Sequence, residues 1–125
     1  MEPSTKGAAL YSFLNSIMTA YAASEVPKDA ILPYLTYEFA TGAWGDGEIP
    51  ITVNMYFYTD SEAVPNAKAQ ELSEAIGMGG KILPYSGGAI WLKRGSPFCQ
   101  SMYEDADHNM KSRYINLSAE FFSEN

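Results

Sequence analysis

The sequence predicts an α+β fold, in which two helices pack on a mainly antiparallel sheet within a single domain, residues 1–125. Period-two alternation of apolar and polar residues indicates strands, and apolar residues spaced three and four apart indicate helices. A chain of 125 residues, 46% of them hydrophobic, is long enough for one domain with its own core. The strands are expected at 34–41, 50–58, 89–93 and 111–122, and the helices at 5–23 and 61–76.

Both predicted helices carry one apolar face. The first begins at Ser4 or Thr5, either of which can cap its N-terminus, and runs to Ala23. It ends before Pro27, because the residue preceding a proline avoids helical angles. The second starts near Ser61 and stops at the glycines that follow residue 76. The expected core-facing residues are Leu10, Phe13, Leu14, Ile17, Met18 and Tyr21 in the first helix, and Pro65, Ala69, Leu72 and Ile76 in the second.

The longest β-rich run spans 48–60, and its length favours a central strand over an edge strand. A hairpin joins it to the strand at 34–41 through a glycine-rich tip at 42–47. Three shorter strands are expected at 81–83, where Pro84 ends the run, at 89–93 and at 98–103. The inward-facing residues of the two longest strands are predicted to be Ile51, Val53, Met55, Phe57, Ile115, Leu117, Ala119 and Phe121.

The net charge of −7 argues against sequence-independent binding of nucleic acid, which needs clustered lysines and arginines. Basic residues gather only at 93–94 and at Lys111 and Arg113, where they are interpreted as ordinary strand-face or strand-end residues. No run of the sequence has the length of a membrane-spanning helix. We also expect no sequence-specific nucleic acid and no membrane among the partners.

Few residues suggest catalysis. Cys99 and His108 are the single cysteine and the single histidine, so neither a disulfide nor a supported Cys–His pair is expected. The segment 104–108, Glu-Asp-Ala-Asp-His, is compatible with a metal site or an acid–base pair, but it lacks the spacing of a calcium loop and is interpreted as a solvated turn. The sequence predicts no catalytic residue, no metal site and no cofactor.

Aromatic residues point instead to a contact with another protein. Trp44 lies in the glycine-rich tip beside Gly45 and Asp46, where it either contacts a partner or folds back over the sheet. Tyr56 and Tyr58 occupy the outward-facing positions of the central strand. These five residues are the candidate partner interface. Tyrosines without interleaved basic residues make a poor platform for nucleic acid and are more typical of protein contacts.

Four stretches together resemble the small tail-terminator, or tail-completion, proteins of tailed bacteriophages and prophages, which belong to the head–tail joining group. They are the N-terminal amphipathic helix, LPYLTYEFATG with the glycine-rich tip, ITVNMYFYTDSEAVPNAKAQELSEAIG, and the final RYINLSAEF strand. The resemblance covers most of the chain. The family has no invariant active-site residues to carry over, and the region 81–103 departs from a clear match in strand order.

The resemblance implies a virion assembly protein without catalysis or cofactor, which acts as a ring of six copies. Its partners would be further copies of itself, the tail tube and the head connector, and its location the virion, or the bacterial cytoplasm during assembly. A ring of subunits carrying −7 each would repel DNA phosphates and let the genome slide through. The alternative that the residues leave open is a small ligand-binding or enzymatic α+β domain.

Overall fold

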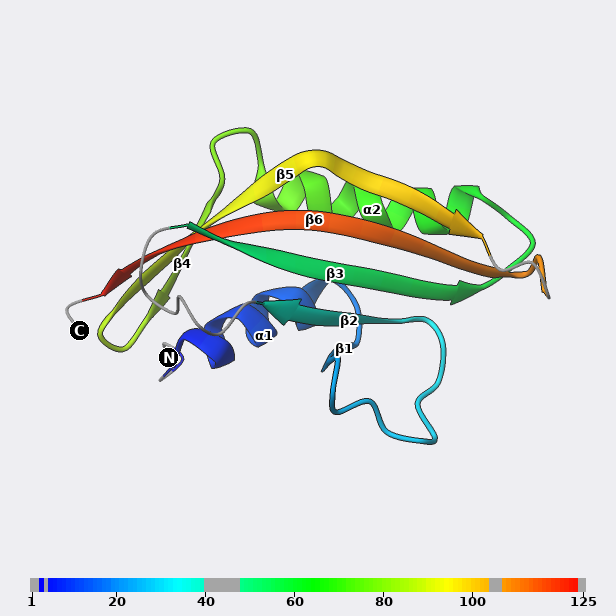
Figure 1. The fold of residues 1–125 in the computed structure, drawn as a ribbon, viewed down its shortest axis with the longest axis horizontal. Helices are drawn as coiled ribbons and strands as arrows, with labels where there is room; N and C mark the ends of the chain where they lie inside the picture. The colour runs from blue at the N-terminus through cyan, green and yellow to red at the C-terminus, as the bar shows by residue number, and fades with distance from the viewer. Residues whose placement is uncertain (1–2, 4, 40–47, 104–106, 124–125) are drawn as a thin grey trace.

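The computed structural model describes residues 3, 5–39, 48–103 and 107–123. It contains two helices and one six-stranded sheet that curls around them, which confirms the predicted α+β class (Figure 1). The elements are, in chain order, α1 (Lys6–Ile17), β1 (Ala20–Ala22), β2 (Tyr34–Phe39), β3 (Glu48–Tyr58), α2 (Ala63–Ile76), β4 (Lys81–Tyr85), β5 (Gly88–Tyr103) and β6 (Met110–Ser123).

The strands lie in the order β1-β2-β3-β6-β5-β4, and every pair is antiparallel except β1 with β2. The long strand β3 is central, as its length predicts. It pairs antiparallel with β2, as the expected hairpin requires; the tip predicted at 42–47 lies outside the described residues. On its other side β3 pairs with β6 from Glu48 opposite Glu120 to Tyr58 opposite Met110.

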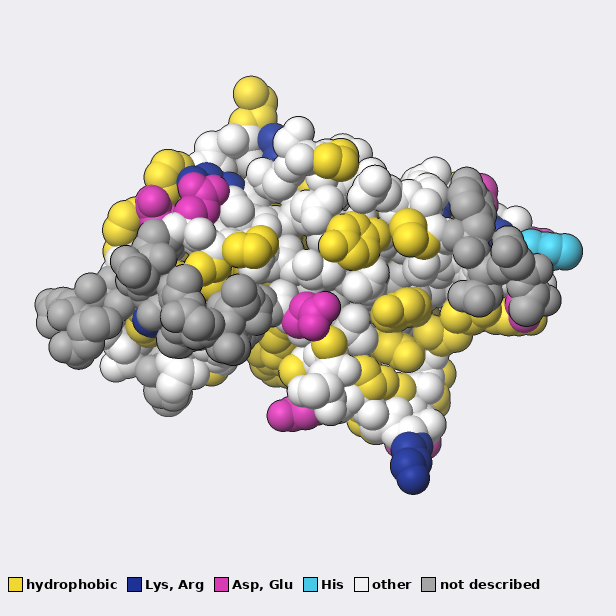
Figure 2. Space-filling view, viewed as in Figure 1, with side chains coloured by type: hydrophobic (Ala, Val, Ile, Leu, Met, Phe, Trp, Pro, Cys, Tyr) yellow, Lys and Arg dark blue, Asp and Glu magenta, His cyan; other side chains and the backbone are white. Residues whose placement is uncertain are grey.

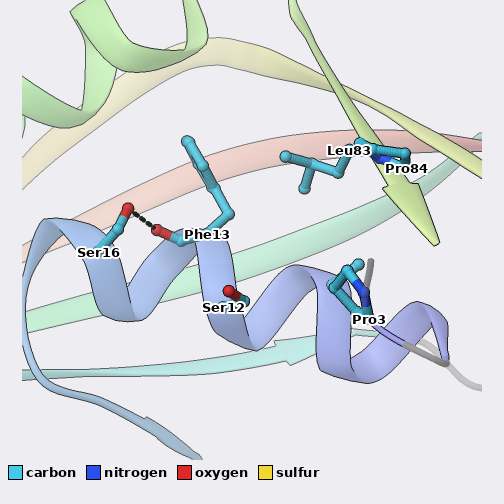
Figure 3. Close-up of a pocket in the computed structure, with 7 residues that line it drawn as sticks. Pro3, Ser12, Phe13, Ser16, Leu83 and Pro84 are labelled. Carbon is cyan, nitrogen blue, oxygen red and sulfur yellow. Dashed lines mark hydrogen bonds between the residues drawn. The ribbon is translucent and has the colours of Figure 1, made fainter. Parts of the chain in front are cut away.

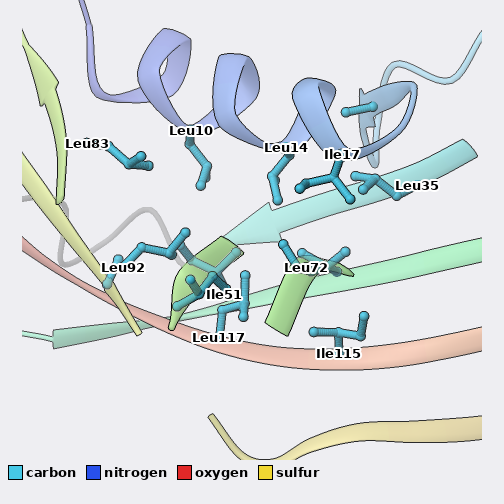
Figure 4. Close-up of a cluster of buried hydrophobic side chains, with 14 of the residues drawn as sticks. Leu10, Leu14, Ile17, Leu35, Ile51, Leu72, Leu83, Leu92, Ile115 and Leu117 are labelled. Carbon is cyan, nitrogen blue, oxygen red and sulfur yellow. The ribbon is translucent and has the colours of Figure 1, made fainter. Parts of the chain in front are cut away.

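Both helices pack on the same face of the sheet, where one hydrophobic core forms (Figure 4). Leu10, Leu14 and Ile17 of α1 point toward the strands, and Leu72 of α2 joins them. Val53 and Leu117, which alternation assigns to the inner face of the sheet, are 0% and 2% exposed. The inward-facing residues predicted for β3 and β6, and all four predicted for α2, are buried.

The N-terminal helix is shorter than predicted, since it ends at Ile17 rather than Ala23. Met18 already has extended backbone angles, and the side chain of Asn15 accepts a hydrogen bond from the backbone N–H of Ala20. The following residues pair with β2 as the short strand β1. Parallel pairing with a distant strand thus outweighs the helical periodicity, which is a local signal. The start is as expected, because Thr5 caps the helix by accepting from the N–H of Ala8.

The strands predicted at 89–93 and 98–103 are one strand, β5, interrupted by a bulge between Arg94 and Cys99. The bulge fits closely against β6: a Cβ on Gly95 would lie 2.7 Å from the carbonyl oxygen of Asn116, whose side chain donates to the carbonyl of Pro97. Strand β4 also continues past its expected end to Tyr85. A proline is tolerated there because β4 is an edge strand.

Candidate functional site

The face of the sheet turned away from the helices, which we call the open face, is the candidate site. In Figure 1 α2 lies behind β5 and β6, so that view shows the open face. The face is formed by the outward residues of each strand, and those along its centre are uncharged and half-buried: Thr52, Asn54 and Tyr56 of β3, and Ser112, Tyr114, Asn116 and Ser118 of β6. Figure 2 shows the centre as a mixture of polar and hydrophobic side chains with few charges.

A row of tyrosines crosses one half of the open face. The rings of Tyr21 and Tyr34 meet edge to face with their centres 5.5 Å apart, and those of Tyr34 and Tyr56 lie 5.6 Å apart at a tilt of 50°. The register explains the row, because Tyr34 is the cross-strand neighbour of Tyr56. Contact among the rings fixes their positions while all three residues stay partly exposed. Rigid tyrosines of this kind are enriched where proteins bind proteins.

The structure describes two of the five residues predicted to contact a partner, Tyr56 and Tyr58. Tyr56 is in the tyrosine row, and Tyr58 follows it on the same face with 58% of its surface exposed. Trp44, Gly45 and Asp46 lie outside the described residues. That these five residues contact a partner protein stays a prediction.

A second aromatic cluster, which sequence reasoning missed, occupies the other end of the open face. Trp91 of β5 stacks on Phe122 of β6 with ring centres 6.4 Å apart, and the ammonium of Lys93 lies 4.4 Å from the centre of the Trp91 ring. The indole N–H donates to the carbonyl of Gly79 at 2.8 Å. The alternation of Trp91 and Lys93 on one strand was the available signal, but it shows neither the Phe122 ring nor the carbonyl that holds the indole.

An acidic residue borders this cluster. Glu48 of β3 accepts hydrogen bonds from the hydroxyl of Ser118 at 2.8 Å and from the ammonium of Lys93 at 3.3 Å. The Ser118 bond first, and then Lys93, hold the pKa of the Glu48 carboxyl below its ordinary value of 4.5. Lys93 therefore links the Trp91 ring to the carboxylate.

The interpretation of Lys111 and Arg113 as ordinary strand residues is wrong. Both are buried, at 8% and 1% exposure, on the helix side of β6. Arg113 donates to the carboxylate of Glu62 at 2.6 Å and to the side chain of Asn66 at 3.1 and 3.2 Å, and Lys111 lies 3.7 Å from Glu62. Burial of a charge requires such partners, and alternation in the sequence cannot reveal them because Glu62 and Asn66 come from the start of α2. This network holds α2 on the sheet.

A shallow apolar groove of about 400 Å³ runs between α1 and β4 (Figure 3). Phe13 and Leu83 project toward it from the two elements, and the hydroxyl of Ser16 is engaged with the carbonyl of Phe13. The lining residues are Pro3, Ala9, Ser12, Phe13, Ser16, Leu83 and Pro84, and none of them carries a charge. The groove offers apolar contact without an acid, a base or a nucleophile positioned for reaction.

A more polar groove of about 370 Å³ lies beside β1 and β2, where Glu25, Tyr37 and Glu38 contribute to its lining. Burial, followed by the neighbouring Tyr11 and Glu25, raises the pKa of the Tyr37 hydroxyl. The phenol therefore stays protonated and able to donate a hydrogen bond. A neutral phenol beside carboxylates is not activated for nucleophilic attack.

Among the described residues, no three histidine, cysteine, aspartate or glutamate side chains lie close enough together to hold a metal ion. The acidic segment considered at 104–108 is described only at its end, where the carboxylate of Asp107 accepts from the N–H of Asn109 and His108 is exposed. Residues 104–106 lie outside the described part of the chain. The described helices include none that is long and apolar enough to cross a membrane.

No protein-family model matches this chain, and no curated protein matches it either.

Proposed function

We propose that this protein is a structural assembly protein of a tailed-phage particle, which completes the tail tube as a ring and joins it to the head. The observation that carries the proposal is the open face: a rigid surface of tyrosines and uncharged polar side chains left uncovered by either helix. Depletion of charge together with enrichment of aromatic residues is characteristic of the centres of protein–protein interfaces. The sequence resemblance supplies the kind of assembly.

The edges of the sheet support a contact through a face. The edge strand β1 has only three residues, and the edge strand β4 has five, with Lys81 at its start and Pro84 within it. Short edge strands that carry lysine and proline resist pairing with a strand of another molecule. Strand addition at either edge is therefore unfavourable, so an assembling partner has more to gain from the open face.

The charge of the chain is compatible with a ring around DNA. Each subunit brings −7, whereas the positions along the centre of the open face in β3 and β6 carry no charge; Glu38 of β2 borders them, and Glu120 lies toward the corner beside Trp91. An interface that is poor in charge lets acidic subunits meet without strong repulsion. The remaining acidic surface would then repel DNA phosphates in the lumen.

Tail assembly in the phage or prophage that encodes the chain tests this proposal. Deletion of the gene should give tails of abnormal length that lack heads, and the wild-type gene should restore joined particles. Asn54→Arg places a charge at the centre of the open face and should block the rescue, whereas Gln70→Arg on the exposed side of α2 should not. Tails of normal length joined to heads in the deletion strain would refute the assembly role.

A further inference from the structure

We propose that a second copy of this chain packs on the corner patch of the open face, about a two-fold axis that passes over Trp91. The corner patch consists of Ile82, Pro84, Ala89, Trp91 and Phe122, from the adjacent strands β4, β5 and β6. The inference rests on the proposed function only in taking the open face as a protein-binding surface.

The corner patch is apolar, contiguous and solvent-exposed. Ile82 is the cross-strand neighbour of Trp91, and Ala89 is the neighbour of both Pro84 and Phe122. Ile82 is 54% exposed and Phe122 49%. Figure 2 shows hydrophobic side chains at this end of the face, beside a group of acidic and basic ones. An apolar cluster with a charged rim marks a site of association more often than a solvated surface.

The centre of the patch is rigid before any partner binds. The Trp91 indole is fixed by its hydrogen bond to Gly79 and by stacking on Phe122. The turn beside the indole requires glycine at position 80, because a Cβ on Gly80 would lie 2.5 Å from the indole nitrogen and the φ angle of Gly80 is +90°. A preorganised aromatic side chain loses little conformational entropy on binding.

The charges on the rim favour a second copy as the occupant. Glu120 is the cross-strand neighbour of Trp91, roughly 5 Å away, and Lys93 lies two residues along β5, roughly 7 Å away. A two-fold axis that lies along the face, passes over Trp91 and bisects the angle between Lys93 and Glu120 brings Lys93 of one copy opposite Glu120 of the other, twice. The ammonium of Lys93, which pairs with Glu48 of its own copy at 3.3 Å, then lies between two carboxylates. Glu120 takes part in none of the ion pairs between described residues, so its half-exposed carboxylate is available to a cation of the second copy. A two-fold contact requires this self-complementarity.

Such a contact closes at two copies and cannot by itself build a ring, because both copies use the same surface. It is therefore a pairing of subunits that adds to the ring contacts. Its strength depends on the apolar centre, and its specificity depends on the two Lys93–Glu120 pairs.

A charge-exchange experiment tests the pairing by sedimentation equilibrium over a wide range of protein concentration. The mass of the wild type should rise toward that of two copies. Lys93→Glu and Glu120→Lys should each weaken association at least about tenfold, because each variant faces like charges across the axis. An equimolar mixture of the two variants should recover association, because both pairs are again of opposite charge in the mixed dimer. Phe122→Ser should weaken every combination.

Two variants with the same changes of charge serve as controls. Lys28→Glu and Glu74→Lys alter exposed residues away from the patch and should leave association within about twofold of the wild type. Circular dichroism and thermal melting establish that each variant is folded. A wild type that stays monomeric throughout, or a mixture that associates no better than its two components, would overturn the inference. The tail-assembly experiment tests the proposed function separately, with Asn54→Arg. The assembly role and the pairing of two copies can therefore be refuted independently.

Discussion

The two partners of the buried ion pair between β6 and α2, Arg113 and Glu62, should differ in how much their loss destabilises the fold. Arg113 has 2% of its side chain exposed, whereas its partner Glu62 has 50%. Glu62→Gln leaves a buried guanidinium without a counter-charge, and Lys111 beside it has only 10% of its side chain exposed. Arg113→Met instead leaves a carboxylate that water can reach. Loss of the more exposed partner should therefore destabilise the fold more than loss of the buried one.

The free-energy cost of each substitution depends on how exposed the charged partner left behind is. An uncompensated buried charge costs about 3 kcal/mol, at the low end of the usual range because the half-exposed position of Glu62 admits water. Arg113→Met removes charge-assisted hydrogen bonds but leaves solvated acceptors, which costs about 1–2 kcal/mol. For a domain of this size, Glu62→Gln should lower the melting temperature by roughly 10 °C.

Urea unfolding followed by tryptophan fluorescence measures the free energy of unfolding of the two single variants and the double variant. In the Arg113→Met background, Glu62→Gln should cost less than it does in the wild type, because the buried guanidinium is gone and only the interaction with Lys111 and the start of α2 remains. Glu71→Gln is the matched control on the same helix. Its partner Lys68 lies in an exposed pair, and its loss should cost less than about 0.5 kcal/mol. Equal costs for Glu62→Gln in both backgrounds would refute the role assigned to the network.

Three further predictions concern other parts of the molecule. Leu117→Asp should unfold the domain, because an unpaired charge in the core costs several kcal/mol; a variant that melts like the wild type, by circular dichroism, would contradict the core assignment. Burial raises the pKa of the Cys99 thiol despite the opposing effect of Arg113, so iodoacetamide should modify the native protein at neutral pH more slowly than the protein in urea; equal rates would contradict this. The lowered pKa of Glu48 stabilises the fold above pH 4.5, and this contribution is lost as the pH falls through the lower value in the folded protein. Acid titration of Glu48→Gln should therefore show a weaker loss of stability below pH 4.5 than that of the wild type.

The strongest periodic signals in the sequence translated directly into structure. Alternation in 48–58 and 110–123 determined which side chains of β3 and β6 are buried. Successive side chains of a strand point to opposite faces of the sheet, and the helices cover only one of those faces. The helical spacing of Pro65, Ala69, Leu72 and Ile76 likewise determined the buried face of α2. The glycine after it ends the helix as predicted, since Gly77 has a φ angle of 78° that other residues rarely adopt.

The tertiary structure alone decided the features that depend on contacts between distant residues. The residues of β1 left the helical pattern to pair with β2, and the bulge of β5 joined two short runs into one strand. The indole of Trp91 found its acceptor twelve positions earlier in the chain, and the guanidinium of Arg113 found Glu62 across the β6–α2 contact. Periodicity records which side of an element faces the core, but not which element lies there. The sequence by itself therefore determined the class of the fold and most of its core, whereas the aromatic contacts on the open face and the ion-pair network of Lys111 and Arg113 arose from packing.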